Sequence, residues 1–312
     1  MDIEVTRYTT DQKKIWDAFI KESKNGLFFF ERNYMDYHAD RFTDHSLVFT
    51  RKNQIIAVFP ATEIKKEIFS HGGLTYGSLI THKRIKATEV LEVFSELKNY
   101  YSSAGFKKMT YKAIPYIFSD FPFQEDLYAL FLNNAQLVRR DISSVISLKN
   151  RLPLAKSPAK KVKDCSALDL KITENKNLEK YWELLSSVLA KHNVKPVHTL
   201  EEIQKLADHF PDNIRLFEVY EEEQLISGSL LFDFGNVVHT QYLANSERGR
   251  EIGALDYLII SLIENQFQNK EYFSFGISTE NQGKFLNEGL INQKEMYGGR
   301  AVCNDFYEIA LN

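Results

Sequence analysis

The chain has 312 residues, a formal net charge of −3 and a hydrophobic fraction of 44%. This length is long for one core and suits two domains of about 150 residues each. The slightly acidic balance excludes a global basic field that would recruit nucleic acid, and the apolar content excludes disorder along the whole chain.

The two cysteines, Cys165 and Cys303, lie far apart in the sequence. A disulfide framework needs more cysteines, and a metal site needs clustered Cys or His, so we expect free thiols and no metal. The first residues carry charges throughout, and no window reaches about 18 uncharged apolar residues. We therefore expect a cytoplasmic protein without a signal peptide or a membrane span.

The first half of the chain alternates helix and strand patterns. Residues 11–24 predict a helix, because apolar side chains recur at helical spacing until Asn25 and Gly26 stop it. Further patterns predict strands at 46–50 and 55–63, an amphipathic helix at 84–101, a strand at 107–112, a short helix at 125–133 and a long strand at 138–148.

Residues 151–167 change this character. Two prolines and five basic residues interrupt the periodicity, although a short basic helix could begin at Pro158. We place the boundary between two lobes here, with residues 1–150 as the first lobe, 151–167 as a basic connecting segment and 168–312 as the second lobe.

The second half repeats the order of the first. Residues 178–192 predict a helix, and Thr199 with Glu202 forms a capping box that starts another helix, which ends near His209. The repeated order predicts an α+β fold with two lobes, each a mixed, mostly antiparallel sheet flanked by helices. The remaining patterns are strands at 214–220, 224–234 and 236–243, a helix at 253–269, a strand at 272–276, a short helix at 281–287 and a closing strand at 301–310.

The most informative stretch is GLINQKEMYGG, residues 289–299. It resembles the ending of Fem-type enzymes, in which Gly-Leu precedes a Phe-Lys-x-x-Phe-Gly motif. Lys294, Tyr297 and Gly298 stand at the lysine, the second aromatic and the glycine, whereas Gln293 replaces the first aromatic. On these residues, and on the FSFG strand before them, the chain resembles the Fem-related tandem GNAT-like acyltransferase family, whose lobes have the acyl-CoA N-acyltransferase fold.

This resemblance implies a catalytic role for Lys294 and substrate contacts for Tyr297 and Gly298. Acyl transfer to an amine builds negative charge on the carbonyl oxygen, and an ammonium placed there stabilises it by about 2.7–4 kcal/mol, by analogy with one oxyanion donor. Lys294 could equally hold a phosphate of the donor or acceptor, or be a surface lysine after a turn.

A donor site is indicated between a strand and an apolar helix at residues 245–254. GNAT enzymes place a glycine-containing loop with a basic residue here, and the helix N-terminus offers amides to the pyrophosphate of acyl-CoA. By resemblance this role falls to Arg248, Arg250, Gly253 and Ala254, although Glu251 occupies the place of a glycine. A charged loop that caps a core helix is the alternative.

A glycine-rich turn in the first half, residues 70–78, is similar to the turn that borders the acceptor cleft in Fem-like first lobes. Glycines allow a backbone to approach a ligand closely. The resemblance implies that the acceptor is bound by His71, Gly72, Gly73 and Tyr76. A plain turn between strands explains the same glycines.

His198 and His239 are the candidates for a general base, an effect of about 10²–10⁴-fold when the geometry is right. His239 lies in a predicted strand near Tyr242, which we take as a further substrate contact. A hydrogen-bonded structural histidine is the alternative for each. We find no Ser-His-Asp or Cys-His motif.

Together these patterns predict an N-acyltransferase that moves an acyl or aminoacyl group from an activated donor to an amine of a cell-surface or cell-wall precursor, by direct attack. The expected co-substrate is acyl-CoA, with aminoacyl-tRNA, which Fem enzymes use, as the alternative. No permanently bound cofactor is expected, and no pattern predicts an oligomeric state. Gln293 and Glu251 favour a second hypothesis, a catalytically silent GNAT-like ligand-binding or scaffold protein.

Overall fold

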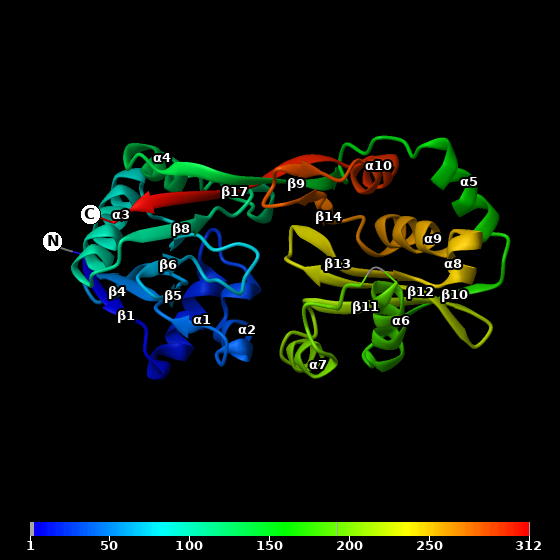
Figure 1. Ribbon diagram of the computed structural model, residues 1–312, viewed down its shortest axis with the longest axis horizontal. Helices are drawn as coiled ribbons and strands as arrows, with labels where there is room; N and C mark the ends of the chain where they lie inside the picture. The colour runs from blue at the N-terminus through cyan, green and yellow to red at the C-terminus, as the bar shows by residue number, and fades with distance from the viewer. Residues whose placement is uncertain (1–2, 192, 312) are drawn as a thin grey trace. The chain divides into compact units, whose positions relative to one another are not determined.

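The computed structural model describes residues 3–191 and 193–311, and the chain divides into two units. The first unit comprises Met1–Asp141, Asn281–Lys284 and Cys303–Asn312, and the second comprises Ile142–Glu280 and Phe285–Val302. The first unit has strands in two sheets, and the second unit has strands in one of these sheets and in a separate two-stranded hairpin. Most strand pairs are antiparallel and helices pack on the sheets (Figure 1), which confirms the predicted α+β fold. No helix within the described residues is long and apolar enough to cross a membrane.

The sheet of the second unit has the strand order β10-β11-β12-β13-β14-β9. All neighbouring strands are antiparallel except β13 and β14, which are parallel. Parallel neighbours need a crossover connection, and the helices between β13 and β14 provide it. The strands are β10 (Leu170–Asn175), β11 (Ile214–Glu221), β12 (Gln224–Asp233), β13 (Val237–Asn245), β14 (Tyr272–Ile277) and β9 (Gln136–Ser147), whose second half belongs to this unit.

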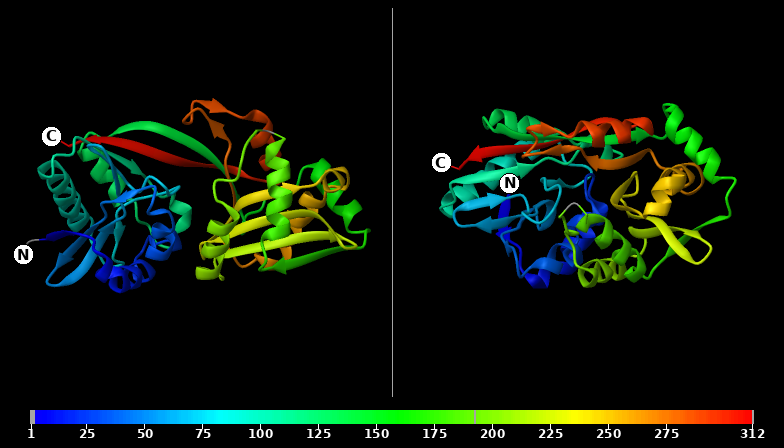
Figure 2. Two further views of the ribbon diagram at one scale, coloured as in Figure 1. Left: turned by 60° about the horizontal axis from the view of Figure 1, so that its bottom comes forward. Right: turned by 45° about the vertical axis from the view of Figure 1, so that its right-hand side comes forward.

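Helices cover both faces of this sheet (Figure 1). The helices α6 (Glu179–Ala190) and α7 (Leu200–His209) lie on one face, and Figure 2 shows α6 in front of the yellow-green strands. The other face carries α5 (Lys156–Cys165), α8 (Glu247–Ile252) and α9 (Ala254–Ser261), which continues into a π-helical turn, Leu262–Gln266. Apolar side chains of α9 pack against the sheet to form the core. A short hairpin, β15 (Thr279–Glu280) and β16 (Phe285–Leu286), precedes α10 (Glu288–Met296).

The first unit also contains one parallel strand pair with a helix in its crossover. β6 (Glu67–Phe69) pairs in parallel with β8 (Lys108–Lys112), and α3 (Ala87–Ser103) lies between them in the chain. Apolar side chains of α3 form the core of this unit with strands that include β3, β4 and β8. The other elements are β1 (Glu4–Arg7), β2 (Thr43–Asp44), β3 (Leu47–Arg51), β4 (Gln54–Phe59), β5 (Thr62–Ile64), β7 (Ile80–Thr81), β17 (Arg300–Ala310), α1 (Lys13–Glu22), α2 (Arg32–Met35) and α4 (Glu125–Leu132).

The division of the chain differs from the boundary predicted at residues 151–167. The first segment of the first unit ends at Asp141, and the chain returns to this unit at Asn281–Lys284 and again from Cys303 onward. The reason is strand pairing, because β17 pairs with β8 over Phe306–Ala310. The basic segment is not a connector either, since it forms α5, which packs on α9.

Two predicted helices have different bounds in the structure. The helix predicted at 281–287 is a hairpin turn and the strand β16, and the helix begins only at Glu288, where the Asn287 side chain caps it. The helix predicted at 178–192 ends at Ala190 in the structure, and its last predicted residue, His192, lies outside the described residues.

Candidate functional site

A row of four side chains crosses the sheet of the second unit. Ile214 pairs with Phe232, Phe232 with His239, and His239 with Ser274. Directly paired residues point to the same face of a sheet, and here it is the face that carries α6 and α7. The row places His239 at the junction of β13 and β14.

His239 is held at this junction as a neutral imidazole. Its Nδ1 lies 3.1 Å from Ser274 Oγ. Burial, followed by the nearby positive charge of Lys294, lowers the pKa of His239 to about 4. A Cβ at Gly276 would lie 3.0 Å from His239 Cε1, so a residue without a side chain lets the imidazole sit here. At neutral pH the ring is therefore uncharged and keeps a nitrogen lone pair.

Lys294 reaches the same junction from α10. Its ammonium donates to the carbonyl oxygens of Gly276 and Ile277, at 3.0 and 2.7 Å. The side chain is buried, and burial lowers the pKa of Lys294 to about 8. An ammonium has three N–H donors, so one is left after these two bonds, as far as the described residues go. The arrangement fixes a cation with one unused donor beside a neutral imidazole.

His198 and Tyr242 form a second pair on the same face. His198 Nδ1 lies 2.8 Å from the Tyr242 hydroxyl, and Trp182 of α6 packs edge-on against the Tyr242 ring. Tyr242 faces this side only because β13 contains a bulge: Tyr242 pairs with Leu230, whereas Thr240 pairs with Leu231. The extra residue turns Tyr242 to the face that His239 occupies.

The pairing between β13 and β14 is short. It covers only Val237–His239 with Tyr272–Ser274, although β13 runs on to Asn245. Beyond His239, the pairs recorded between described residues join β13 to β12 alone. Backbone amides and carbonyls on the other side of β13 can therefore bond to an extended ligand that carries amide groups.

Two residues of the C-terminal motif take structural positions. Tyr297 is buried in the core beside α9, where its ring stacks on Phe275 and its hydroxyl bonds to Asp256 at 3.0 Å. Gly298 follows with a φ of 92°, which favours glycine at this turn. These positions give Tyr297 and Gly298 roles in packing and chain direction in place of the predicted substrate contacts.

The predicted donor loop is already partly occupied by protein groups. Arg248 makes two hydrogen bonds of 2.7 Å to the Glu221 carboxylate, and Ala254 is buried in the core. Gly253 has a φ of 83° at the start of α9, and a Cβ there would lie 2.7 Å from Lys161 Cβ. Arg250 lies in the last turn of α8. The side chain that covers Gly253 at the start of α9 is thus Lys161, whose ammonium lies 3.6 Å from the Asp256 carboxylate.

The glycine-rich turn lies in the first unit and is tightly packed. His71 is buried with a φ of 57°, and its ring stacks on His38 with centroids 5.4 Å apart. A Cβ at Gly73 would lie 2.1 Å from His38 Nε2. Gly72 donates its amide to Thr62 Oγ1 at 2.8 Å, and the buried Tyr76 packs against Phe118. Each of these four residues thus contacts other protein groups, and the two glycines allow close packing.

Sequence reasoning missed two residues of the junction, Ser274 and Gly276. Both lie in the FSFG strand, but a serine and a glycine in a strand carry no chemical signature of their own. Their roles depend on which residues pair across β13 and β14. Within the described residues there is no group of three or more His, Cys, Asp or Glu that could hold a metal ion.

Comparison with protein families matches residues 155–282 to the acetyltransferase (GNAT) domain. This part of the second unit is therefore similar to a GNAT acetyltransferase domain. The matched range includes His239, Ser274 and the loop before α9, and Lys294 follows it. The match supports the prediction of an acyltransferase. No match is found among curated proteins.

Solved structures share the fold over both units of the chain. A structure of FemX is 11% identical and has a TM-score of 0.69, with 99% of this chain and 98% of that chain covered. L-PGS from Bacillus licheniformis is 11% identical with a TM-score of 0.64, covering 98% and 93%. A tandem GNAT protein from the clavulanic acid biosynthesis pathway is 8% identical with a TM-score of 0.52, covering 100% and 99%. These likenesses confirm the Fem-like tandem GNAT fold.

Proposed function

We propose that the protein is an N-acyltransferase that moves an acyl or aminoacyl group from an activated donor to an amine of a cell-surface or cell-wall precursor. The observation that carries the proposal is the junction of β13 and β14, where a neutral His239 lies beside the buried ammonium of Lys294. One group accepts a proton and the other stabilises an oxyanion, which are the two needs of acyl transfer to an amine.

In the proposed reaction the amine nitrogen attacks the carbonyl carbon of the activated acyl group. A C–N bond forms, the bond from carbon to the leaving sulfur or oxygen breaks, and the proton from nitrogen passes to His239. When His239 donates Nδ1–H to Ser274 Oγ, Nε2 carries the lone pair that takes this proton. The remaining N–H of Lys294 donates to the carbonyl oxygen as its charge grows.

The donor in this proposal is acyl-CoA, the usual co-substrate of a GNAT domain. Its pantetheine amides would pair with the backbone of β13 beyond His239, and its phosphates would lie near the start of α9, Lys161 and Arg250. Aminoacyl-tRNA is the alternative, because its phosphates could use the same cations and the lysines of α5. FemX and L-PGS share the fold, and this likeness does not distinguish between the two donors.

A cytoplasmic location is part of this proposal, and the two free cysteines favour a reducing compartment. The competing function is a catalytically silent ligand-binding protein. Two observations favour it: Glu221 already neutralises Arg248, and Lys161 covers Gly253.

Donor binding is the experiment that tests the proposal. Thermal unfolding would be followed with acetyl-CoA, longer acyl-CoAs, free CoA and uncharged tRNA, and a ligand at 100 times its Kd stabilises the fold by about 2.7 kcal/mol. We expect a shift with CoA compounds that Lys161→Gln weakens and that Lys163→Gln, an exposed control on α5, does not.

The other outcomes of this binding experiment favour a different donor or a different function. A shift with tRNA alone replaces acyl-CoA by the aminoacyl-tRNA donor. A shift with CoA compounds but no release of thiol with any amine acceptor favours the silent binding protein. No shift with either ligand contradicts the proposed donor classes.

A further inference from the structure

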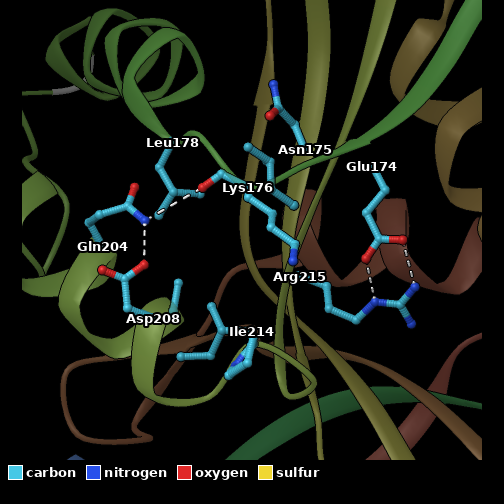
Figure 3. Close-up of a pocket in the computed structure, with 11 residues that line it drawn as sticks. Glu174, Asn175, Lys176, Leu178, Gln204, Asp208, Ile214 and Arg215 are labelled. Carbon is cyan, nitrogen blue, oxygen red and sulfur yellow. Dashed lines mark hydrogen bonds and ion pairs between the residues drawn. The ribbon is translucent and has the colours of Figure 1, made fainter.

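A cavity of about 260 Å³ lies in the second unit between α7 and the edge of the sheet formed by β10 and β11 (Figure 3). Drug-sized ligands usually fill about 300–1,000 Å³, so this cavity fits a smaller metabolite. Its walls carry apolar side chains from both sides, namely Leu178, Ala207, Pro211, Ile214 and Leu216.

Charged groups of both signs stand around these apolar walls. Arg215 makes two hydrogen bonds to Glu174, at 2.7 and 2.9 Å, so this pair is mutually neutralised. Lys176 and Asp208 also line the cavity, and no ion pair within the described residues is recorded for either. The formal charges of these four side chains cancel, because two are cationic and two are anionic.

One amide joins the Asp208 carboxylate to the backbone at Lys176. Gln204 Nε2 donates to Asp208 Oδ1 at 3.0 Å and, more weakly, to the backbone carbonyl of Lys176 at 3.5 Å. Figure 3 shows this bridge on the α7 side, opposite the Glu174–Arg215 pair. The Asp208 carboxylate is thus held before any ligand binds, which lowers the ordering cost of binding, and the exposed Lys176 side chain projects from the backbone that the same amide contacts.

We propose that this cavity binds a free α-amino acid with an aliphatic side chain. The carboxylate of the ligand pairs with Lys176, its ammonium pairs with Asp208, and its side chain packs on Leu178, Ile214 and Leu216. A net-neutral site with two separated charges is complementary to a zwitterion, whereas an anion alone would leave Asp208 unpaired.

The cavity is distinct from the junction of β13 and β14 but close to it. Ile214 lines the cavity and belongs to the row that continues through Phe232 to His239, two strands away, or roughly 10 Å. The helix α7 is shared, since Gln204 and Asp208 face the cavity and His198 directly precedes its N-cap. Binding in the cavity does not require acyl transfer, so it is tested independently of the proposed function.

Isothermal titration of the full chain with L-leucine, N-acetyl-L-leucine and L-leucinamide tests the proposal. We expect saturable binding of leucine and binding about tenfold weaker for each blocked derivative, because each lacks one charge. Lys176→Gln should weaken leucine about tenfold but leave leucinamide unchanged. Asp208→Asn should weaken leucine similarly but leave N-acetyl-leucine unchanged.

The control is Lys205→Gln, an exposed lysine of α7 that does not line the cavity. It should bind leucine as the unmodified chain does, and circular dichroism establishes that each variant is folded. The proposal is overturned if leucine shows no saturable binding at millimolar concentrations. It is equally overturned if Lys176→Gln and Asp208→Asn bind all three compounds like the control.

Discussion

Burial lowers the pKa of both His239 and Lys294, and so favours the neutral form of each side chain. The pKa of His239 falls from 6.5 to about 4, and the pKa of Lys294 falls from 10.5 to about 8. Between each pair of values the unfolded chain binds a proton that the folded protein does not, so stability rises with pH there. Lys294 remains a cation at neutral pH, whereas His239 is uncharged.

Stability should therefore fall as the pH drops from about 6.5 to 4, in part because His239 resists protonation. His239→Gln removes this contribution, and the acid loss should shrink by an amount on the order of 3 kcal/mol. Urea unfolding at pH 7, 5.5 and 4.5 measures the difference. The control His209→Gln changes an exposed histidine of α7. Equal acid sensitivity in both variants would show that His239 is not buried as a neutral ring.

Which of these residues could be predicted depends on their chemistry. Lys294 and His239 were named because an ammonium and an imidazole have recognisable roles. Roles for Ser274 and Gly276 could not be predicted, because they depend on strand pairing that no sequence motif indicates. Tyr297 stands at the second aromatic position of the Fem-type motif, yet its ring is buried in the core beside Phe275, where burial of a large aromatic is favourable.

Among the elements, α7 has the clearest local signal. Thr199 accepts from the Glu202 amide, and Glu202 accepts from the Thr199 amide, as the capping box predicted. This cap fixes the start of α7 next to His198, which bonds to Tyr242. The bulge in β13 had no signature in the sequence, and the hairpin at 279–286 displaced a predicted helix because Asn287 caps α10 instead.

Thr199→Ala should lower the free energy of unfolding by about 1 kcal/mol, because an amide of the first turn loses its acceptor. The matched control is Ser187→Ala in α6, where the exposed hydroxyl donates to the Leu184 carbonyl of its own helix. Chemical unfolding of both variants measures the effect. If the two losses are equal, the cap contributes nothing beyond an ordinary surface hydroxyl.

At the scale of the whole molecule, the chain leaves the first unit in β9 and returns to it in β17. The end of the chain completes the core of the first unit, where Ile309 and Leu311 are buried. Element types were predictable from periodicity, but this return was not, because pairing between β8 and β17 joins residues nearly two hundred positions apart. A boundary drawn at the basic segment therefore assigned the last strand to the second lobe.

Two substitutions in β17 should act on different units. Ile309→Ala removes a buried side chain of the first unit and should cost about 2–5 kcal/mol there. Val302→Ala lies in the part of β17 that belongs to the second unit. Hydrogen exchange should therefore speed up in α3 and β8 for Ile309→Ala, and in β14 for Val302→Ala. Faster exchange confined to the second unit in both variants would contradict this division.

The measurement that bears most directly on the central claim is turnover of Lys294→Met with the donor that binding identifies. Methionine keeps the length of the side chain but removes the ammonium, and loss of one oxyanion donor typically lowers kcat by about 10²–10³. Lys284→Met, at an exposed lysine, is the matched control. We expect kcat to fall by that factor in Lys294→Met and to stay unchanged in Lys284→Met. If Lys294→Met turns over as fast as the control, the junction of β13 and β14 is not where acyl transfer is catalysed.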